Sequence, residues 1–338
     1  MNSSDRNPWG LRATLLGLIG LALVLSLPGW AAAVPINLGA ASPYTVLGLG
    51  STVGIGSQDT VDANQATIVG NVAVGADTNS PTRAGRGIFQ KGFIHGNLYV
   101  DTAATYHIEG KNFGVTGTTF GTVPAPPPPP PVHPNADGRG TFDLRSAVQA
   151  AVDASATYAG GTAIADINDR SATLTAGNYR VTNFRLNSDV LTITGGPSAS
   201  FVLNVTGGFD VSHGEIRLSG GILADNVLFN VTGTGTTVTV HKDDSIFIGT
   251  LLAVNRDIII SELGVDSAPG AGPGNPGFLG RIIGALNHEL TVHSGAQVTH
   301  PPTSQVPEPP TLLLLGSGLL VGGILGRKKS STRGRELR

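Results

Sequence analysis

The stretch Ser200–Gly233, SFVLNVTGGFDVSHGEIRLSGGILADNVLFNVTG, decides the fold class of this chain. It consists of short apolar runs separated by glycine-containing turns, and the runs at Phe201 and Val227 are nearly continuously apolar rather than alternating. Continuous apolar runs of strand length indicate strands that are covered on both faces. The phrase LNVTGG at Leu203 returns as FNVTGTG at Phe229, which favours stacked coils with a loose repeat.

The same pattern continues on both sides of this stretch. Strand-sized runs joined by glycine-rich turns, without intervening helices, extend from Ala172 to Val298. This excludes a sheet of alternating strands and helices and leaves a sandwich, a barrel or a solenoid. The apolar runs and recurring phrases favour a solenoid, and the irregular repeat makes it a discontinuous one. Upstream, helical spacing of apolar residues predicts one amphipathic helix from Asp143 to Tyr158.

The segment from Ile36 to Val123 also consists of short apolar runs split by Gly, Asn and Asp. A proline tract, Pro124–Pro134, follows and is expected to be a stiff, extended spacer or an insertion. The tract would usually mark a domain boundary. We nevertheless favour one domain with an insertion over two separate domains.

Several phrases in this order resemble the shared plan of exported bacterial β-solenoid domains, the ice-binding-like and choice-of-anchor A domains. They are INLGAASPYTVLGLGSTV, TLTAGNYRV, GGPSASFVLNVTGG, LSGGILADNVLFNVTG, GTLLAVNRDIII and GRIIGALNHELTVHSGAQV. The resemblance covers about residues 36–299, with an interruption at the proline tract. It implies a mainly β fold, a right-handed parallel β-helix of triangular section with one long helix packed alongside.

Composition limits the function classes. Charged residues make up 13% of the chain, against about 25% in an average globular protein, and there are 48 glycines. Because the chain has no cysteine, it has no disulfide, thiolate metal site or cysteine nucleophile. The net charge of −2 gives no electrostatic basis for binding nucleic acid, and no cofactor is expected.

The C-terminal residues have the layout of an envelope sorting tag. Pro307, Glu308 and Pro309 precede an apolar run, 311–326, which is followed by Arg327, Lys328 and Lys329. The run is slightly shorter than the ~20 residues of a membrane helix, and the basic residues after it predict a cytoplasmic tail. The layout resembles PEP-CTERM proteins, which implies processing by an exosortase-type enzyme. The alternative is a plain membrane anchor on a proline-rich stalk.

The N-terminus agrees with export. Arg6 and Arg12 precede the apolar stretch 13–27, and Ala31 and Ala33 fit a signal-peptidase site, with cleavage after Ala33. An uncleaved N-terminal anchor is the alternative. The expected segments are a signal peptide (1–33), an N-terminal β segment (34–123), a proline-rich linker or insertion (124–134), the helix plus solenoid (135–300), a sorting region (301–310), a transmembrane helix (311–326) and a basic tail (327–338).

Motifs of enzymatic chemistry are absent from the sequence. It contains no G-x-S-x-G elbow, no H-E-x-x-H helix and no P-loop. Asp210, Glu215 and Asp225 are near one another in sequence, as a polysaccharide-cleaving β-helix would need, but no spacing rule links them. The histidines are scattered, and the cluster at 241–244 is interpreted as a solvated turn. We therefore expect neither an enzyme nor a metal site.

Two asparagines stand in N-x-T triplets, Asn204 and Asn230. Each lies inside an apolar run. A stacked asparagine whose amide is bonded by neighbouring backbone is therefore favoured over a glycosylation site.

Threonine pairs suggest a surface function. In a T-x-T pair on a strand, both hydroxyls point to one face, and stacked pairs would form a grid that could bind ice. The candidate ice-facing residues are Thr173, Thr175, Thr192, Thr194, Thr237 and Thr239. Our main hypothesis is a non-enzymatic structural or adhesion protein of the cell surface or exopolysaccharide matrix. The alternative is an ice-binding or carbohydrate-binding face on the same solenoid, and a polysaccharide-cleaving enzyme is a further one.

Overall fold

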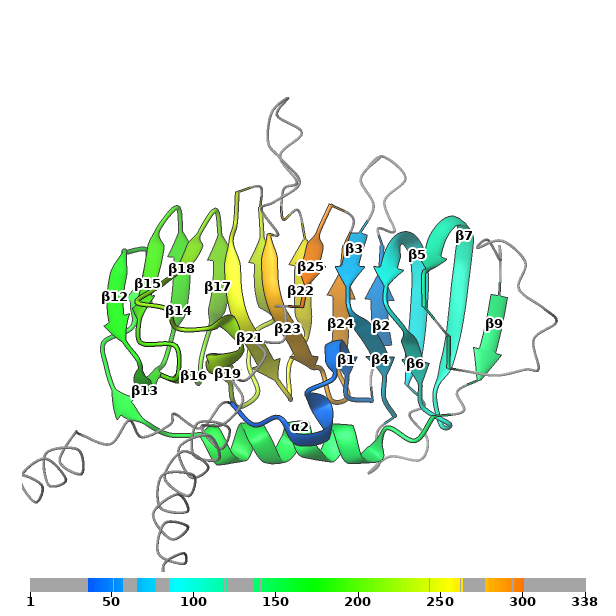
Figure 1. Cartoon of the computed structure of the whole chain (residues 1–338), viewed down its shortest axis with the longest axis horizontal. Coiled ribbons are helices and arrows are strands. Elements are labelled where there is room, and N and C mark those ends of the chain that lie inside the picture. Colours follow the sequence, from blue (N-terminus) through cyan, green and yellow to red (C-terminus); the bar gives the residue numbers. More distant parts are fainter. Residues whose placement is uncertain are drawn as a thin grey trace, which may run out of the picture. The chain divides into compact units, whose positions relative to one another are not determined.

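The computed structural model is a parallel β-solenoid in which short strands stack along one axis (Figure 1). It describes residues 36–50, 52–56, 66–76, 85–117, 119–120, 136–139, 142–242, 244–261, 263, 277–293 and 295–300. The predicted signal peptide, proline tract, sorting motif, apolar C-terminal run and basic tail lie outside these residues. Within the described ranges, no helix has the length and apolarity needed to cross a bilayer.

Each coil contributes strands to three parallel ladders, named here A, B and C. Ladder A contains, in stacking order, β10 (Thr162–Ala163), β13 (Gly177–Val181), β16 (Phe201–Val205), β19 (Val227–Val231), β21 (Phe247–Ala253), β23 (Phe278–Gly284), β1 (Tyr44–Gly48), β4 (Asn71–Val74), β6 (Leu98–Val100) and β8 (Thr119–Phe120).

Ladder B contains β11 (Ile167–Asn168), β14 (Phe184–Asn187), β17 (Phe209–Ser212), β20 (Val238–His241), β22 (Ile258–Ser261), β24 (Glu289–Val292), β2 (Thr52–Ile55), and the first halves of β5 (Arg86–His95) and β7 (Thr105–Val115). The short β9 (Ala136–Arg139) pairs with β7 in the antiparallel sense.

Ladder C contains β12 (Ala172–Thr175), β15 (Val190–Thr194), β18 (Glu215–Ser219), the beginnings of β21 and β23, then β25 (Gln297–Thr299), β3 (Ala66–Val69) and the second halves of β5 and β7. Two single turns of 3₁₀ helix, η1 (Gly39–Ala41) and η2 (Ala224–Asn226), lie in the connections. The predicted mainly β, discontinuous solenoid is confirmed.

The order of coils in the stack differs from their order along the chain. The N-terminal β1 lies between β4 and the late strand β23, with Val46 opposite Ile282. Likewise β3 lies between β5 and β25, with Ile68 opposite Val298. The N-terminal strands and the last described strands therefore meet in the interior of the stack, at a junction that we call the seam.

The α-helix of the described residues, α2 (Arg145–Tyr158), runs along the stack beside ladder A (Figure 1). It begins two residues later than predicted, and Leu144 is the residue at its N-terminal cap. Just before the helix, the Asp143 Oδ1 accepts the backbone N–H of Arg145 at 3.0 Å. The buried Asp101 fixes the same end by accepting the N–H of Leu144 at 2.8 Å. Buried alanines and Val148 of α2 pack on outward residues of ladder A such as Leu228.

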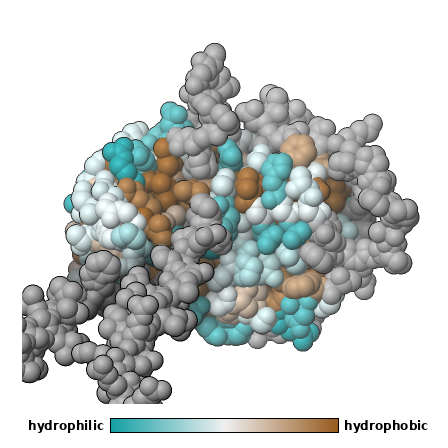
Figure 2. Space-filling view, viewed as in Figure 1, coloured by the Kyte–Doolittle hydropathy of each residue, from teal (hydrophilic) through white to brown (hydrophobic). Residues whose placement is uncertain are grey.

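This helix explains the continuous apolar runs of the sequence. Ladder A strands such as β16 and β19 are buried at every residue, because one side faces the solenoid interior and the other faces α2. Inside the solenoid, phenylalanines stack from coil to coil. The ring centroids of Phe229 and Phe247 are 4.9 Å apart, and those of Phe247 and Phe278 are 4.5 Å apart. Figure 2 shows that apolar residues on the visible surface form separate patches among paler and hydrophilic ones.

Two asparagines lie between ladder A and the helix. The Nδ2 of Asn230 donates to the Oδ1 of Asn204 at 2.8 Å, and the Nδ2 of Asn204 donates to the Oδ1 of Asn178 at 2.9 Å. Asn230 also bonds both the hydroxyl and the carbonyl of Ser155 on α2. Both N-x-T asparagines are buried, which agrees with the stacked interpretation.

A buried guanidinium joins the turns between ladders A and B. The side chain of Arg256 is fully buried. It donates to backbone carbonyls of the two preceding coils, those of Thr206, Gly207, Thr232, Gly233 and Thr236. Burial lowers the pKa of Arg256. One side chain thus supplies hydrogen-bond donors to several backbone carbonyls in these turns, and buried carbonyls need such partners.

Two strands of ladder B, β14 and β17, leave only a weak apolar pattern in the sequence. β14 reads FRLN and β17 reads FDVS, so each has only two apolar residues that alternate with polar ones. In the structure the apolar residues point inward and the polar ones outward, because ladder B has one solvated face.

We predict that Arg256→Met lowers the free energy of unfolding by about 3 kcal/mol, because several buried carbonyls would lose their donor. Urea denaturation of the purified protein measures this change. Arg185→Met is the control, since the Arg185 side chain is 51% exposed and an exposed ion pair contributes less than about 1 kcal/mol. Equal effects of the two substitutions would contradict the structural role of Arg256.

Candidate functional site

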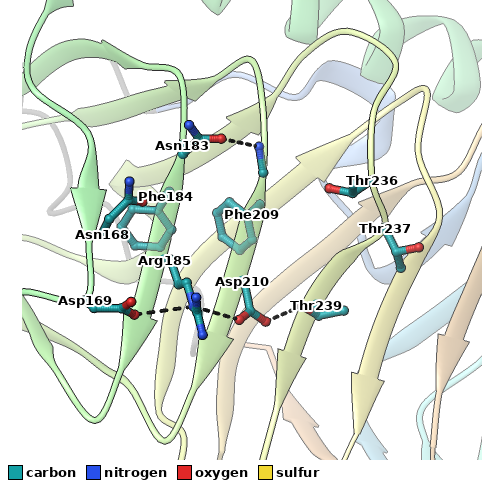
Figure 3. A pocket seen from close by; sticks show the side chains of 11 residues that line it. Asn168, Asp169, Asn183, Phe184, Arg185, Phe209, Asp210, Thr236, Thr237 and Thr239 are labelled. Atoms are coloured by element: carbon teal, nitrogen blue, oxygen red, sulfur yellow. Dashed lines mark hydrogen bonds and ion pairs between the residues drawn. The ribbon is translucent and has the colours of Figure 1, made fainter.

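A polar groove lies on ladder B, over β14, β17 and β20, near the end of the stack where β11 pairs with β14 (Figure 3). Its volume is about 480 Å³. The groove is lined by Asn168, Asp169, Asn183, Phe184, Arg185, Gly208, Phe209, Asp210, Thr236, Thr237 and Thr239. The phenylalanines belong to the core, so the accessible side chains are mainly polar.

The polar side chains form a row across neighbouring strands. Arg185 is in register with Asp210, and Asp210 is in register with Thr239. The Nε of Arg185 lies 3.3 Å from the Oδ1 of Asp169 and 3.6 Å from the Oδ2 of Asp210. The Thr239 hydroxyl donates to Asp210, whose Oδ1 also lies 3.1 Å from the Nε2 of His241. Every charged group in the row thus has a partner (Figure 3).

The backbone of the groove is held in place by buried or half-buried groups. The Oδ1 of Asn183 accepts the N–H of Gly208 at 2.9 Å, as Figure 3 shows. Arg256 donates to the carbonyl of Gly207, which precedes the lining residue Gly208. It also donates to the carbonyl of Thr236, which itself lines the groove. The groove is therefore preformed rather than dependent on a ligand for its shape.

The turn before β11 carries an acid with a shifted pKa. Hydrogen bonds lower the pKa of Asp166: the largest contribution comes from the backbone of Asn183, while desolvation opposes the shift. The Asn183 side chain and the Thr182 backbone N–H also donate to this carboxylate, at 2.9 and 2.8 Å. The charged form of Asp166 therefore stabilises the connection to β14.

The three acids considered as a cleavage site do not converge. Asp210 lies on ladder B beside Arg185. Glu215 lies on ladder C and pairs with Arg217 at 2.7 Å. Asp225, in η2, pairs with Arg281 at 2.7 Å. Since each of these three acids is held by a different arginine, the three do not converge on one substrate.

The histidines do not form a metal site among the described residues, where no group of three His, Asp or Glu side chains could hold an ion. His288 lies with its Nδ1 3.3 Å from the Oδ1 of Asp257, and His241 is engaged with Asp210. These pairs are salt bridges or hydrogen bonds on the wall of ladder B.

The six candidate threonines divide between two ladders. On ladder C, Thr173 is in register with Thr192, and Thr175 with Thr194. The next strand, β18, continues these rows with Arg217 and Ser219. The hydroxyl grid therefore covers two strands and then meets an ion pair.

The third threonine pair lies at ladder B, where Thr239 is on β20 and Thr237 precedes the first residue of that strand. Thr237 and Thr239 line the polar groove, and the Thr239 hydroxyl is bonded to Asp210. The groove was not predicted from the sequence. Its charged residues Arg185 and Asp210 lie on β14 and β17, and Asp169 follows β11 directly. The alternation of polar and apolar residues in FRLN and FDVS was the available indication.

The predicted sorting and signal-cleavage residues are not part of the site described above. They lie outside the described residues. These are Pro307, Glu308, Pro309, Arg327, Lys328 and Lys329 for sorting, and Ala31 and Ala33 for signal cleavage.

Two family models match the chain. The model of the ice-binding-like adhesive domain matches residues 31–266, and that of the PEP-CTERM protein-sorting motif matches residues 305–329. Both resemblances noted from the sequence are thereby confirmed. No protein of curated function matches.

Solved structures of ice-binding proteins are similar to the chain. The ice-binding protein LeIBP from an Arctic yeast is 21% identical, with a TM-score of 0.48 over 81% of this chain and 98% of that one. An ice-binding protein from an Antarctic biological consortium is 21% identical, with a TM-score of 0.44 over 80% and 92%. The DUF3494 domain of a Shewanella frigidimarina ice-binding protein is 16% identical, with a TM-score of 0.45 over 80% and 99%.

We predict that the Asp166 carboxyl titrates below the value of about 3.9 that an unfolded aspartate has. Because the folded-state pKa is lowered, its stabilising contribution is present at neutral pH. That contribution is lost as pH falls through the unfolded value toward the folded one. Carboxyl NMR titration of the purified protein measures the pKa, and the unfolding midpoint of Asp166→Asn should depend less on pH below about 5 than that of the wild type. A titration midpoint at or above 3.9 would be incompatible with the hydrogen bonds described.

Proposed function

The chain belongs to the ice-binding-like adhesive domain family, and from this premise we propose that it is a non-enzymatic adhesion protein of the cell surface or exopolysaccharide matrix. The observation that carries the proposal is the combination, in one chain, of this domain with a PEP-CTERM sorting motif, which indicates export to the cell envelope. In this proposal the solenoid domain supplies the adhesive surface, and the sorting motif directs the chain to the cell envelope.

The charged residues on the outer surface of the solenoid support a non-enzymatic role. The acids Asp210, Glu215 and Asp225 pair with three different arginines at separate places on the solenoid. Asp210 shares its arginine, Arg185, with Asp169. A hydrolase of polysaccharides would instead need two carboxylates on either side of one glycosidic bond. A stiff surface with preformed polar and apolar patches suits binding to an extended polymer.

The proposed route to the surface uses both ends of the chain. Signal peptidase would cleave after Ala33, and the apolar run 311–326 with Arg327, Lys328 and Lys329 would hold the protein in the membrane provisionally. An exosortase-type enzyme would then process the chain near Pro307, Glu308 and Pro309. The described body ends at His300, so such a cut would leave every ladder complete.

Replacing Pro307, Glu308 and Pro309 by alanine is predicted to leave the protein unprocessed in the membrane fraction of the native host, because the processing enzyme would lose its recognition element. Immunoblotting of membrane, surface and culture fractions measures this. The matched control replaces Pro301 and Pro302, which precede the matched sorting motif of residues 305–329 and should be dispensable. Unchanged release of the triple variant would refute the sorting route.

Ice binding is the competing function, and the registered threonines of β12 and β15 favour it. Binding of ice by such a surface needs a flat and extended array. Here the array is limited to two strands, because Arg217 and its partner Glu215 follow on β18. The adhesion role therefore remains the better supported of the two.

Ice crystals grown in a dilute solution of the processed protein are predicted to remain rounded, because the threonine grid ends after two strands. Microscopy of single crystals during slow cooling provides the measurement. Faceted crystals that become rounded again with Thr192→Tyr would instead establish ladder C as an ice-binding face.

A further inference from the structure

An exposed pair of aromatic rings lies on ladder C, away from the polar groove and the threonine grid. Phe93 is 38% exposed, whereas most large apolar side chains of the described residues are buried. It lies two residues before His95 on β5, and the two rings are nearly parallel, at 17°, with centroids 6.1 Å apart. Residues two apart on a strand point to the same face, so both rings project outward.

The strands beside β5 surround this pair with small and uncharged side chains. Phe93 is in register with Thr67, and His95 with Val69, on β3. β25 continues the two rows with Gln297 and Thr299. The alternate residues Ile68, Ile94 and Val298 are buried in the core, which confirms that the former set faces outward. We call the outward set the ring platform: Thr67, Val69, Phe93, His95, Gln297 and Thr299.

The other neighbouring strand leaves room for the exposed ring. Gly114 of β7 is in register with Phe93. A Cβ at this glycine would come within 2.9 Å of the Cδ1 and 3.0 Å of the Cε1 of Phe93. The ring therefore occupies the space that a side chain at residue 114 would fill, and it leans over the adjacent strand.

The chemistry of the ring platform matches a sugar polymer without charge. Aromatic rings offer apolar faces to the C–H groups of a pyranose, and the hydroxyl of Thr67 and the amide of Gln297 can bond sugar hydroxyls. None of the six side chains is Lys, Arg, Asp or Glu, so the platform itself offers no ion pair to a uronic acid or an acidic lipid. Lys91, two residues before Phe93 on β5, lies at its border. The polar members make a purely apolar partner a poor fit, because their bonds to water would be lost.

We propose that the ring platform is a binding site for a neutral polysaccharide chain, with Phe93 as its central contact. The inference rests on the proposed matrix function and gives it a ligand class. The polymer lies across β25, β3 and β5, and successive sugar units meet the outward rows of the ladder. The site is separate from the groove at β14 and β17, and it needs neither a metal nor a moving lid.

The test is a binding assay with the purified, processed protein on neutral polysaccharides, namely cellulose, chitin, mannan and β-1,3-glucan, with alginate as an anionic probe. We expect retention on at least one neutral polymer and a loss of about tenfold in affinity with Phe93→Ala, since one stacked ring contributes on the order of 1.4 kcal/mol. Phe93→Trp should retain binding, because a larger ring keeps the apolar face.

Leu223→Ala is the matched control, since Leu223 is also exposed, at 36%, but lies outside the ring platform. Thermal unfolding of each variant separates loss of binding from loss of fold. The proposal is overturned if no neutral polymer retains the protein, if Phe93→Ala and Leu223→Ala bind alike, or if alginate alone binds in a salt-sensitive manner.

Fractionation of cells that express Phe93→Ala distinguishes this inference from the proposed function. A variant that reaches the surface normally but no longer binds the polymer supports both. A wild-type protein that binds the polymer in vitro but stays in the cytoplasm would refute the surface function and leave the ring platform intact.

Discussion

Parallel stacking of coils is the constraint on which the rest of this structure depends. Each strand of an interior coil uses its backbone groups on the coils above and below, so like residues come to lie on like residues. Phe247 stacks on Phe278 inside the solenoid, and Asn230 bonds Asn204 beneath the helix. A chain without cysteine has no covalent alternative to these contacts. The buried Arg256 follows the same rule, because it satisfies carbonyls of the two coils before its own.

The sequence predicts the fold well where burial leaves a strong pattern. The apolar strands of ladder A and the amphipathic helix were recognisable because each is covered by the other. The strands of ladder B were harder to recognise, since β14 and β17 have only two inward residues each. The seam could not be predicted, because the contact between Val46 and Ile282 is set by the return of the chain along α2 and not by local sequence.

The functional surfaces were less accessible to sequence reasoning than the fold. Spacing predicts that Thr173 and Thr175 share one face of a strand. Only the register between strands shows that Thr192 lies beside Thr173 and that Arg217 ends this row. Phe93 could not be singled out in the run GFIH, because an outward phenylalanine and the inward Ile94 look equally suited to a core. Outward and inward residues of such a run can be distinguished only when the register with the neighbouring strands is known.

The seam would have a mechanical consequence if the protein is attached through its C-terminal side, as proposed above. The last described strand, β25, is bonded on one edge to β23 and on the other to β3, and the N–H of His300 donates to the carbonyl of Val69. Tension transmitted through residue 300 therefore loads two rows of bonds in shear at once. A coil at either end of the stack has only one such row and would peel away under a smaller force. By leaving from the middle, the chain places its attachment point where the solenoid is hardest to unravel.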